Sequence, residues 1–173
     1  MGGFCFENTL PDEAGLVRIC GPGFVGGILK GEDRYLQKSH CYYAPEQEVW
    51  VEFTADYHDQ TDPIKEIVEV FVTREPLCDK SYVPRKRFEK FATPKGIQIG
   101  SLENDVIRAY GDPTRIDDSI ERERRDPRYK STQLASKYGS RVFVYLAGED
   151  SLLRAHFYIK DGRVHSILVS VSE

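Results

Sequence analysis

The chain has 173 residues, of which 40% are hydrophobic and 30% charged, and this composition is typical of a globular protein with a hydrophobic core. Its 24 basic and 28 acidic residues give a net charge of −4, which argues against a nucleic-acid-binding protein, because such proteins neutralise many phosphates. No apolar run approaches the roughly 20 residues that a membrane-spanning helix needs, so we expect no membrane span.

The N-terminal segment MGGFCFENTL lacks the basic start and the apolar stretch of about 7–15 residues that mark a signal peptide. It fits either a cytoplasmic protein or the mature form of an exported one. The four cysteines, Cys5, Cys20, Cys41 and Cys78, lie in the first half of the chain without the close pair that a zinc site usually has. Two disulfides in an exported protein are favoured, in any of three pairings, and buried free thiols are the alternative.

Residues 1–31 are rich in Gly and Pro, and we expect a turn-rich connection with one short strand, because the run CGPGFVGGILKG lacks the full phosphate-loop motif. Residues 40–54 and 64–75 each contain a strand, since their side chains alternate in character with a period of two. The residues on the expected core face are Val49, Val51, Phe53, Val68, Val70 and Val72, and those on the opposite face are Trp50, Glu52, Thr54, Glu69, Phe71 and Thr73. The polar segment ADYHDQTDP between them predicts a loop, so the two strands should form an antiparallel hairpin with a long connection.

Prolines interrupt residues 75–95, which also contain the basic run Arg85–Arg87, and this segment is expected to be a linker with solvated charges. The chain is therefore divided into an N-terminal β-rich half at residues 1–80, a linker at 81–95 and a C-terminal half at 96–173. The two halves could also form one continuous domain.

The stretch GIQIGSLENDVIRAYGDPTRID, residues 96–117, predicts a short helix with clear ends. Ser101 is the expected N-cap, Gly111 supplies the left-handed C-terminal residue, and Pro113 prevents continuation. The apolar stripe of this helix comprises Leu102, Val106, Ile107 and Tyr110. The helix should therefore dock on an apolar surface.

Residues 118–138 are charged, and only STQLASKY within them has a helical pattern. After Gly139, three strands are expected at RVFVYLAG, LLRAHFYIK and RVHSILVSVSE, the last two joined by the hairpin turn Asp161-Gly162. The segments IKEIVEVFVTRE and RVHSILVSVSE lie about 100 residues apart, and both have the residue pattern of a terminal strand that follows an alternating strand and a turn. This favours an internal duplication, and two unrelated strands of similar composition are the alternative.

The segment KGIQIGSLENDVIRAYGDPTRID, followed by RVFVYL and LLRAHFYIKDGRVHSILVS, resembles the pattern of the β-lactamase-inhibitor-protein-like fold, which includes the small outer-membrane lipoproteins of the SmpA/OmlA type. The matching residues are Gly96, Gly100, Val106, Tyr110, Gly111, Pro113, Val164 and Ile167, and the likeness covers about residues 94–173. It implies an export-associated binding module that holds a partner protein through a concave sheet face or a loop. The same resemblance supports disulfides and a secreted, periplasmic or cell-envelope location.

Strand alternation also gives candidate binding residues, because aromatic rings among charges on one sheet face are typical of protein-binding surfaces. The candidates are Trp50, Phe71, Tyr145, Arg154, His156 and Tyr158. The alternative is that a helix or the N-terminal segment covers these rings. A second cluster, His58 with Asp56, Asp59 and Asp62, could hold a metal, although such polar loops are more often solvated.

The sequence thus predicts an α+β protein, an antiparallel β-sheet packed by one or two short helices, which could consist of two related halves. The expected function is a non-enzymatic, exported protein–protein interaction module, inhibitor-like or envelope-associated, without catalytic residues, metal or cofactor. Its protein partner is unknown, and a second copy of the chain is one candidate. The alternatives are a metal-dependent or other hydrolase around His58, a small-ligand carrier, and a cytoplasmic location.

Overall fold

The computed structural model describes residues 14, 16, 24–25, 29–30, 36–57, 66–78, 91–118, 138–147 and 153–171. The chain divides into two compact units, Met1–Phe91 and Ala92–Glu173, and the division falls inside the range expected as a linker. In both units the described residues are mostly antiparallel sheet, and the second unit contains the short helix, which is consistent with the predicted α+β class.

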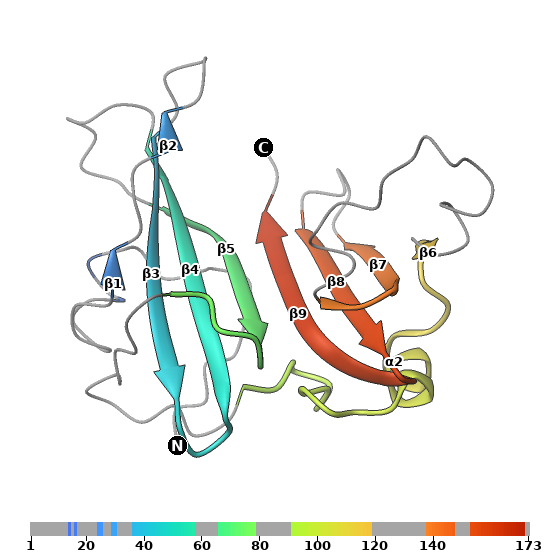
Figure 1. Ribbon diagram of the computed structural model, residues 1–173. Coiled ribbons are helices and arrows are strands. Elements are labelled where there is room, and N and C mark those ends of the chain that lie inside the picture. The colour runs from blue at the N-terminus through green and yellow to red at the C-terminus, as the bar shows by residue number, and fades with distance from the viewer. Residues whose placement is uncertain are drawn as a thin grey trace, which may run out of the picture. The chain divides into compact units, whose positions relative to one another are not determined.

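The described residues of the first unit form five strands (Figure 1). They are β1 (Phe24–Val25), β2 (Leu29–Lys30), β3 (Leu36–Ala44), β4 (Val49–Tyr57) and β5 (Glu66–Thr73). β3 pairs with β4 and β4 with β5, while the short strands β1 and β2 pair with different parts of β3, and every pairing is antiparallel. The predicted hairpin of β4 and β5 is therefore confirmed.

The sequence pattern did not separate β3 from β4, because the tight turn between them carries no glycine. The turn begins at Pro45, and the amide of Gln47 donates to the carbonyl of Ala44 at 3.2 Å. Glu48 closes the turn with a φ of 52°, in the left-handed region that glycine or asparagine would usually occupy.

The core face of the first unit follows the predicted alternation except at one bulge. Val51 and Phe53 are fully buried, and Val70 is 1% exposed. Thr54 pairs with Glu69 whereas Ala55 pairs with Ile67, so Val68 is an extra residue in β5. The prediction that Val68 lies on the core face is therefore wrong, and Ile67 takes that place, with 2% of its surface exposed.

In the part of the second unit that the structure describes, four strands follow the order β6-β7-β8-β9, each antiparallel to its neighbour. They are β6 (Arg115–Asp118), β7 (Arg141–Ala147), β8 (Leu153–Lys160) and β9 (Arg163–Val171). The three strands predicted after Gly139 are confirmed. So is the turn between β8 and β9, where Asp161 and Gly162 have φ values of 52° and 70° and Lys160 pairs with Arg163.

The predicted helix is α2 (Glu103–Tyr110), but its N-terminus is held by tertiary contacts rather than by Ser101. The Ser101 hydroxyl accepts a hydrogen bond from the amide of Gln98 at 3.0 Å. The first helical amide, of Glu103, instead donates to the carbonyl of Gly162 at 2.9 Å. At the other end Gly111 has a φ of 82° and its amide donates to Ile107, as the sequence predicts.

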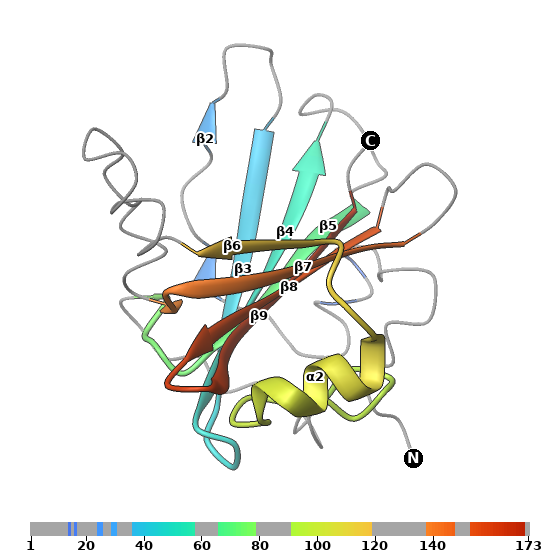
Figure 2. The same ribbon diagram turned by 90° about the vertical axis from the view of Figure 1, so that its right-hand side faces the viewer.

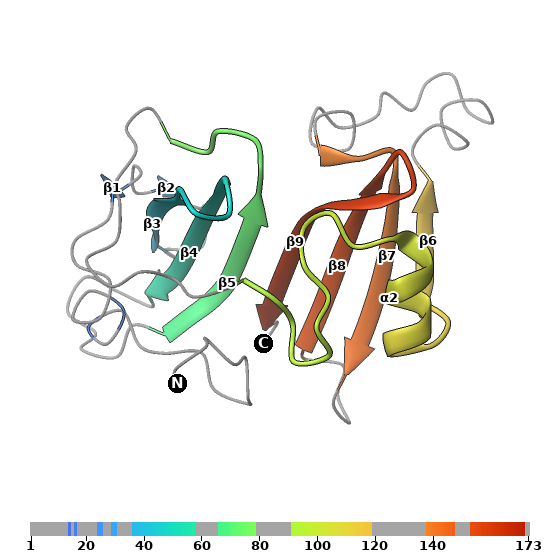
Figure 3. The same cartoon turned by 90° about the horizontal axis from the view of Figure 1, so that it is seen from below.

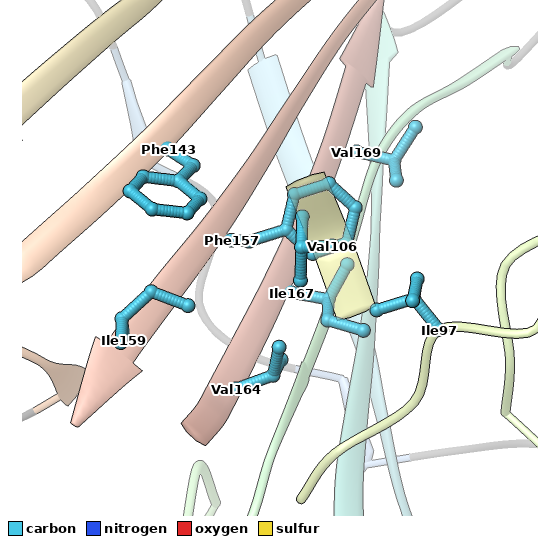
Figure 4. Packing of buried hydrophobic residues seen from close by; sticks show 8 residues of the cluster. All are labelled: Ile97, Val106, Phe143, Phe157, Ile159, Val164, Ile167 and Val169. Carbon is cyan, nitrogen blue, oxygen red and sulfur yellow. The ribbon is translucent and has the colours of Figure 1, made fainter. Parts of the chain in front are cut away.

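α2 packs on one side of the β6–β9 sheet (Figure 2, Figure 3). Its central residue Val106 is fully buried in the core cluster of the second unit. That cluster consists of Ile97, Val106, Phe143, Phe157, Ile159, Val164, Ile167 and Val169 (Figure 4). Leu102 is 45% exposed, so the predicted apolar stripe is wrong at its first residue, because the helix begins after it.

Neither α2 nor any other helix that the structure describes is long and apolar enough to cross a membrane. The remaining described helical residues are few. Ala14 and Leu16 of the first unit have helical backbone, and Leu16 is fully buried. The segment STQLASKY, where a second helix was expected, lies outside the described residues except for Tyr138.

Candidate interaction surface

The sheet of the second unit presents one face to α2 and a different set of side chains to the other side. We call this second set the far face. Because side chains alternate along each strand, register assigns its members. They are Arg115 and Asp117 on β6, Val142, Val144 and Leu146 on β7, Arg154, His156 and Tyr158 on β8, and Ser166, Leu168 and Ser170 on β9.

Three predicted site residues, Arg154, His156 and Tyr158, lie together on the far face. Arg154 is exposed and His156 and Tyr158 are half-buried, whereas their neighbours Val144 and Ser166 are buried. The exposed part of the far face therefore lies around Arg154. Directly opposite Arg154 on β7 is Leu146, which is 39% exposed. The structure therefore places an exposed cation and an exposed apolar side chain next to two partly covered rings.

Arg115 is a member of this surface that the sequence analysis missed. It pairs with Val144, which in turn pairs with His156, so Arg115 and His156 lie in one row across three strands. Its guanidinium contacts the carboxylate of Asp117 at 2.7 Å. β6 escaped prediction because its one apolar residue, Ile116, is 53% exposed and gives no burial pattern.

The charges on the far face are incompletely balanced. Asp117 already pairs with Arg115, and Arg154 forms no ion pair with any residue that the structure describes. Burial lowers the pKa of His156 below its ordinary value of 6.5, and the positive charges of Arg115 and Arg154 lower it further, while Asp117 acts in the opposite direction. His156 is therefore mostly neutral at pH 7, and Arg154 carries the uncompensated charge.

Tyr138 partly covers Tyr158. The two rings meet edge to face with centroids 6.3 Å apart, and Tyr138 is only 6% exposed. The next residue, Gly139, lies so close to β8 that a Cβ atom there would be 2.7 Å from the carbonyl oxygen of Ile159. This close approach to the backbone of Ile159 requires glycine. Because it fixes the position of Gly139, it also holds the preceding residue, Tyr138, against Tyr158.

Tyr145, another predicted site residue, lies on the opposite side of the sheet. Its ring contacts Tyr110 of α2 at 5.4 Å and Phe157 at 5.7 Å, and its hydroxyl donates to the carbonyl of Gly111 at 3.0 Å. Burial raises the pKa of Tyr145, with Asp112 and Tyr110 contributing in the same direction. The structure therefore does not bring Tyr145 together with Arg154, His156 and Tyr158.

Trp50 and Phe71 belong to the first unit and share a face with Glu52. Trp50 is half-buried and its ring contacts Tyr43 on β3 at 5.1 Å. Phe71 is 8% exposed, so it does not present its ring to solvent as the alternation predicted. Burial raises the pKa of Glu52, which pairs with Phe71 across the strands, and a hydrogen bond from Ser39 acts against this shift.

A disulfide joins Cys41 to Cys78 in the first unit, with Cα atoms 6.5 Å apart. Cys41 points to the same side of β3 as Tyr43, because the two are separated by one residue. The bridge thus fixes the segment after β5 beside the face that carries Trp50. Cys5 and Cys20, the other two candidates, lie outside the described residues.

The cluster around His58 cannot be placed, since His58, Asp59 and Asp62 lie outside the described residues and only the backbone of Asp56 is described. Within the part of the chain that is described, no group of three or more His, Cys, Asp or Glu side chains is arranged to hold a metal ion. Neither a protein-family model, nor a curated protein, nor a solved structure matches this chain.

Proposed function

We propose that this chain is a non-enzymatic protein–protein interaction module that binds its partner through the far face of the second unit. The observation that carries the proposal is the pairing of Arg154 with Leu146 beside the half-buried rings of His156 and Tyr158. Arginine and tyrosine are enriched among residues that dominate binding energies, and such residues are often surrounded by apolar contacts that exclude water. Because α2 packs on the other side of the sheet, docking here needs no rearrangement of the helix.

The location and the kind of partner are part of the same proposal. The resemblance of residues 94–173 to the β-lactamase-inhibitor-protein-like fold supports an exported protein, inhibitor-like or associated with the cell envelope. The disulfide between Cys41 and Cys78 is in keeping with that location, since disulfides persist mainly in oxidising compartments. Fold resemblance alone does not fix a function, so the surface itself has to be tested.

Two exposed leucines offer a matched test. Leu146 lies on the far face, whereas Leu102 lies at the start of α2, and their exposed fractions are 39% and 45%. A photo-reactive amino acid at position 146 should cross-link to one protein in an extract of the source organism's envelope, and the same amino acid at position 102 should not. Equal cross-linking from both positions, or none from position 146, would contradict the proposal.

Side-chain truncation separates binding from folding. Arg154→Ala should weaken capture of the cross-linked protein while leaving the thermal midpoint unchanged, because the side chain is exposed. Tyr158→Ala should also weaken capture. If Tyr158→Ala or Trp50→Ala instead unfolds the protein, that ring serves the fold rather than the surface.

A further inference from the structure

We infer that the partner presents an acidic protein segment to the far face, with a carboxylate that pairs with Arg154. This inference rests on the proposed function and names the chemistry of its partner. It follows from the balance of charge on the surface, from the apolar surroundings of Arg154, and from the number of cations available.

The charge balance favours an anionic group. The far face contains Arg115, Asp117 and Arg154, and Lys160 extends it at the end of β8, two residues beyond Tyr158 on the same side. Asp117 is the one carboxylate in this set, and Arg115 already engages it at 2.7 Å. Neither Arg154 nor Lys160 forms an ion pair with any described residue, so the surface lacks one or two negative charges.

The surroundings of Arg154 favour a carboxylate that becomes desolvated on docking. Leu146 lies opposite Arg154 on β7 and Ser170 lies opposite it on β9, while Leu168 lies opposite His156. A docked chain that covers these leucines excludes water from the guanidinium, which strengthens a hydrogen-bonded ion pair. Arginine can also bind a carboxylate through two parallel N–H···O bonds, and this geometry adds orientation to the attraction.

The number of cations favours a protein segment over a nucleic acid. One arginine and one lysine neutralise few phosphates, whereas nucleic-acid affinity depends on many such neutralisations. Half-buried side chains such as Tyr158 and Leu168 instead suit a peptide with apolar residues between its acids. A segment that alternates acidic and apolar side chains satisfies both features.

A peptide titration tests the inference directly. Three fluorescein-labelled probes are compared. The first is a peptide of repeated Glu-Leu-Glu-Tyr, the second is the same peptide with Gln in place of Glu, and the third is a single-stranded oligonucleotide of similar length. The Glu peptide should bind the full chain about tenfold more tightly than the Gln peptide, which corresponds to one charge-assisted contact. Arg154→Gln should remove that difference, whereas Arg108→Gln, an exposed cation on α2, should leave it within about twofold.

The outcomes are distinct. Equal binding of the Glu and Gln peptides, an unchanged affinity in Arg154→Gln, or tighter binding of the oligonucleotide than of the Glu peptide would each overturn the inference. A protein cross-linked from position 146 whose affinity falls in Tyr158→Ala but not in Arg154→Gln would also overturn it, while leaving the far face as the docking surface of the proposed function. Absence of any cross-link from position 146 would contradict the proposed function. In that case the peptide titration would still show whether the far face prefers the Glu peptide to the Gln peptide.

Discussion

The two units repeat one arrangement of strands. In each, three long strands form an antiparallel meander, β3-β4-β5 in the first unit and β7-β8-β9 in the second. In each, a tyrosine of the first strand meets a phenylalanine of the middle strand edge to face, Tyr42 with Phe53 at 6.1 Å and Tyr145 with Phe157 at 5.7 Å. The correspondence supports the hypothesis of an internal duplication.

The bulges and edge strands repeat as well. The last strand of each meander carries an extra residue at its third position, Val68 in β5 and His165 in β9, because Tyr158 pairs with Ser166 while Ile159 pairs with Val164. A short strand pairs with the first long strand of each meander, β1 with β3 and β6 with β7. Two unrelated meanders would rarely have a bulge at the same position, since bulges are specific features of a strand pair. The shared bulge therefore also favours a duplication.

The repeated framework carries different chemistry on equivalent positions. The place of Arg154 in the second unit is taken by Trp50 in the first, and the place of His156 is taken by Glu52. The position of Val144 is occupied by Cys41, which forms the disulfide. The first unit therefore has an aromatic residue, an acid and a cross-linked cysteine where the second has an arginine, a histidine and a valine. The framework fixes positions, and the surface residues determine what can bind.

The largest expected effect comes from the two equivalent phenylalanines. Phe53 and Phe157 are both fully buried, so Phe53→Ala and Phe157→Ala should each lower the free energy of unfolding by about 3–5 kcal/mol. Urea denaturation measures both. Ile116→Ala is the control, because a side chain that is 53% exposed should change the free energy by less than about 0.5 kcal/mol. A loss below about 1 kcal/mol for either phenylalanine would break the equivalence.

The second-largest effect is expected on removing the disulfide, which should destabilise the first unit more than the second. Cys41 and Cys78 are 37 residues apart, and a cross-link over a loop of that length is expected to stabilise by about 3–4 kcal/mol. In a variant carrying Cys41→Ser and Cys78→Ser, amide hydrogen exchange should accelerate in β3 and β4 more than in β7 and β8. Equal acceleration in both units, or none in the first, would show that the bridge does not act on the first unit in particular.

Local signals account for the parts of the fold that sequence predicted well. Alternation around Phe53 and Phe157 gave the faces of β4 and β8, because each of these strands has one apolar and one mixed side. The turn at Asp161-Gly162 was predictable because both residues must adopt positive φ. The C-terminus of α2 at Gly111 followed from the same conformational preference.

Tertiary contacts account for the parts that were missed. The amide of Glu103 bonds to Gly162, far along the chain, so no local pattern could reveal that Ser101 is not the cap. β7 has apolar residues on both sides, so alternation alone could not assign Tyr145 to one face of the sheet. Of the candidate site, Arg154, His156 and Tyr158 could be grouped from one strand, but Arg115 reaches them only through the pairing of β6 with β7.

A smaller effect is expected at Glu52. Burial raises its pKa above the ordinary value of 4.5, so the folded chain holds this proton to higher pH than the unfolded chain does. Its contribution to stability is full below pH 4.5 and is lost as the pH rises through the folded pKa. Glu52→Gln should therefore raise the thermal midpoint at pH 8 and have little effect at pH 4. Glu48→Gln, at an exposed turn position, is the control, and equal shifts in both variants would contradict a specific cost at Glu52.

His156, at the equivalent position, should behave in the opposite sense and with the smallest effect. Its pKa is lowered by burial and then by Arg115 and Arg154, with Asp117 opposing, so the unfolded chain takes up the proton first as the pH falls. Stability is full above pH 6.5 and declines as the pH drops from there through the folded pKa. His156→Gln should flatten this decline in a series of thermal midpoints from pH 8 to pH 5.

The same histidine links stability to binding. In an NMR titration, Arg154→Gln should move the pKa of His156 upward, because one of the two positive charges beside it is removed. A docked carboxylate should move the pKa in the same direction, so the acidic peptide should bind more tightly at pH 5.5 than at pH 7.5, and this gain should disappear in His156→Gln. If His156 titrates at or above its ordinary value in the unchanged chain, or if the peptide binds equally at both pH values, the far face does not hold this ring between two arginines as described.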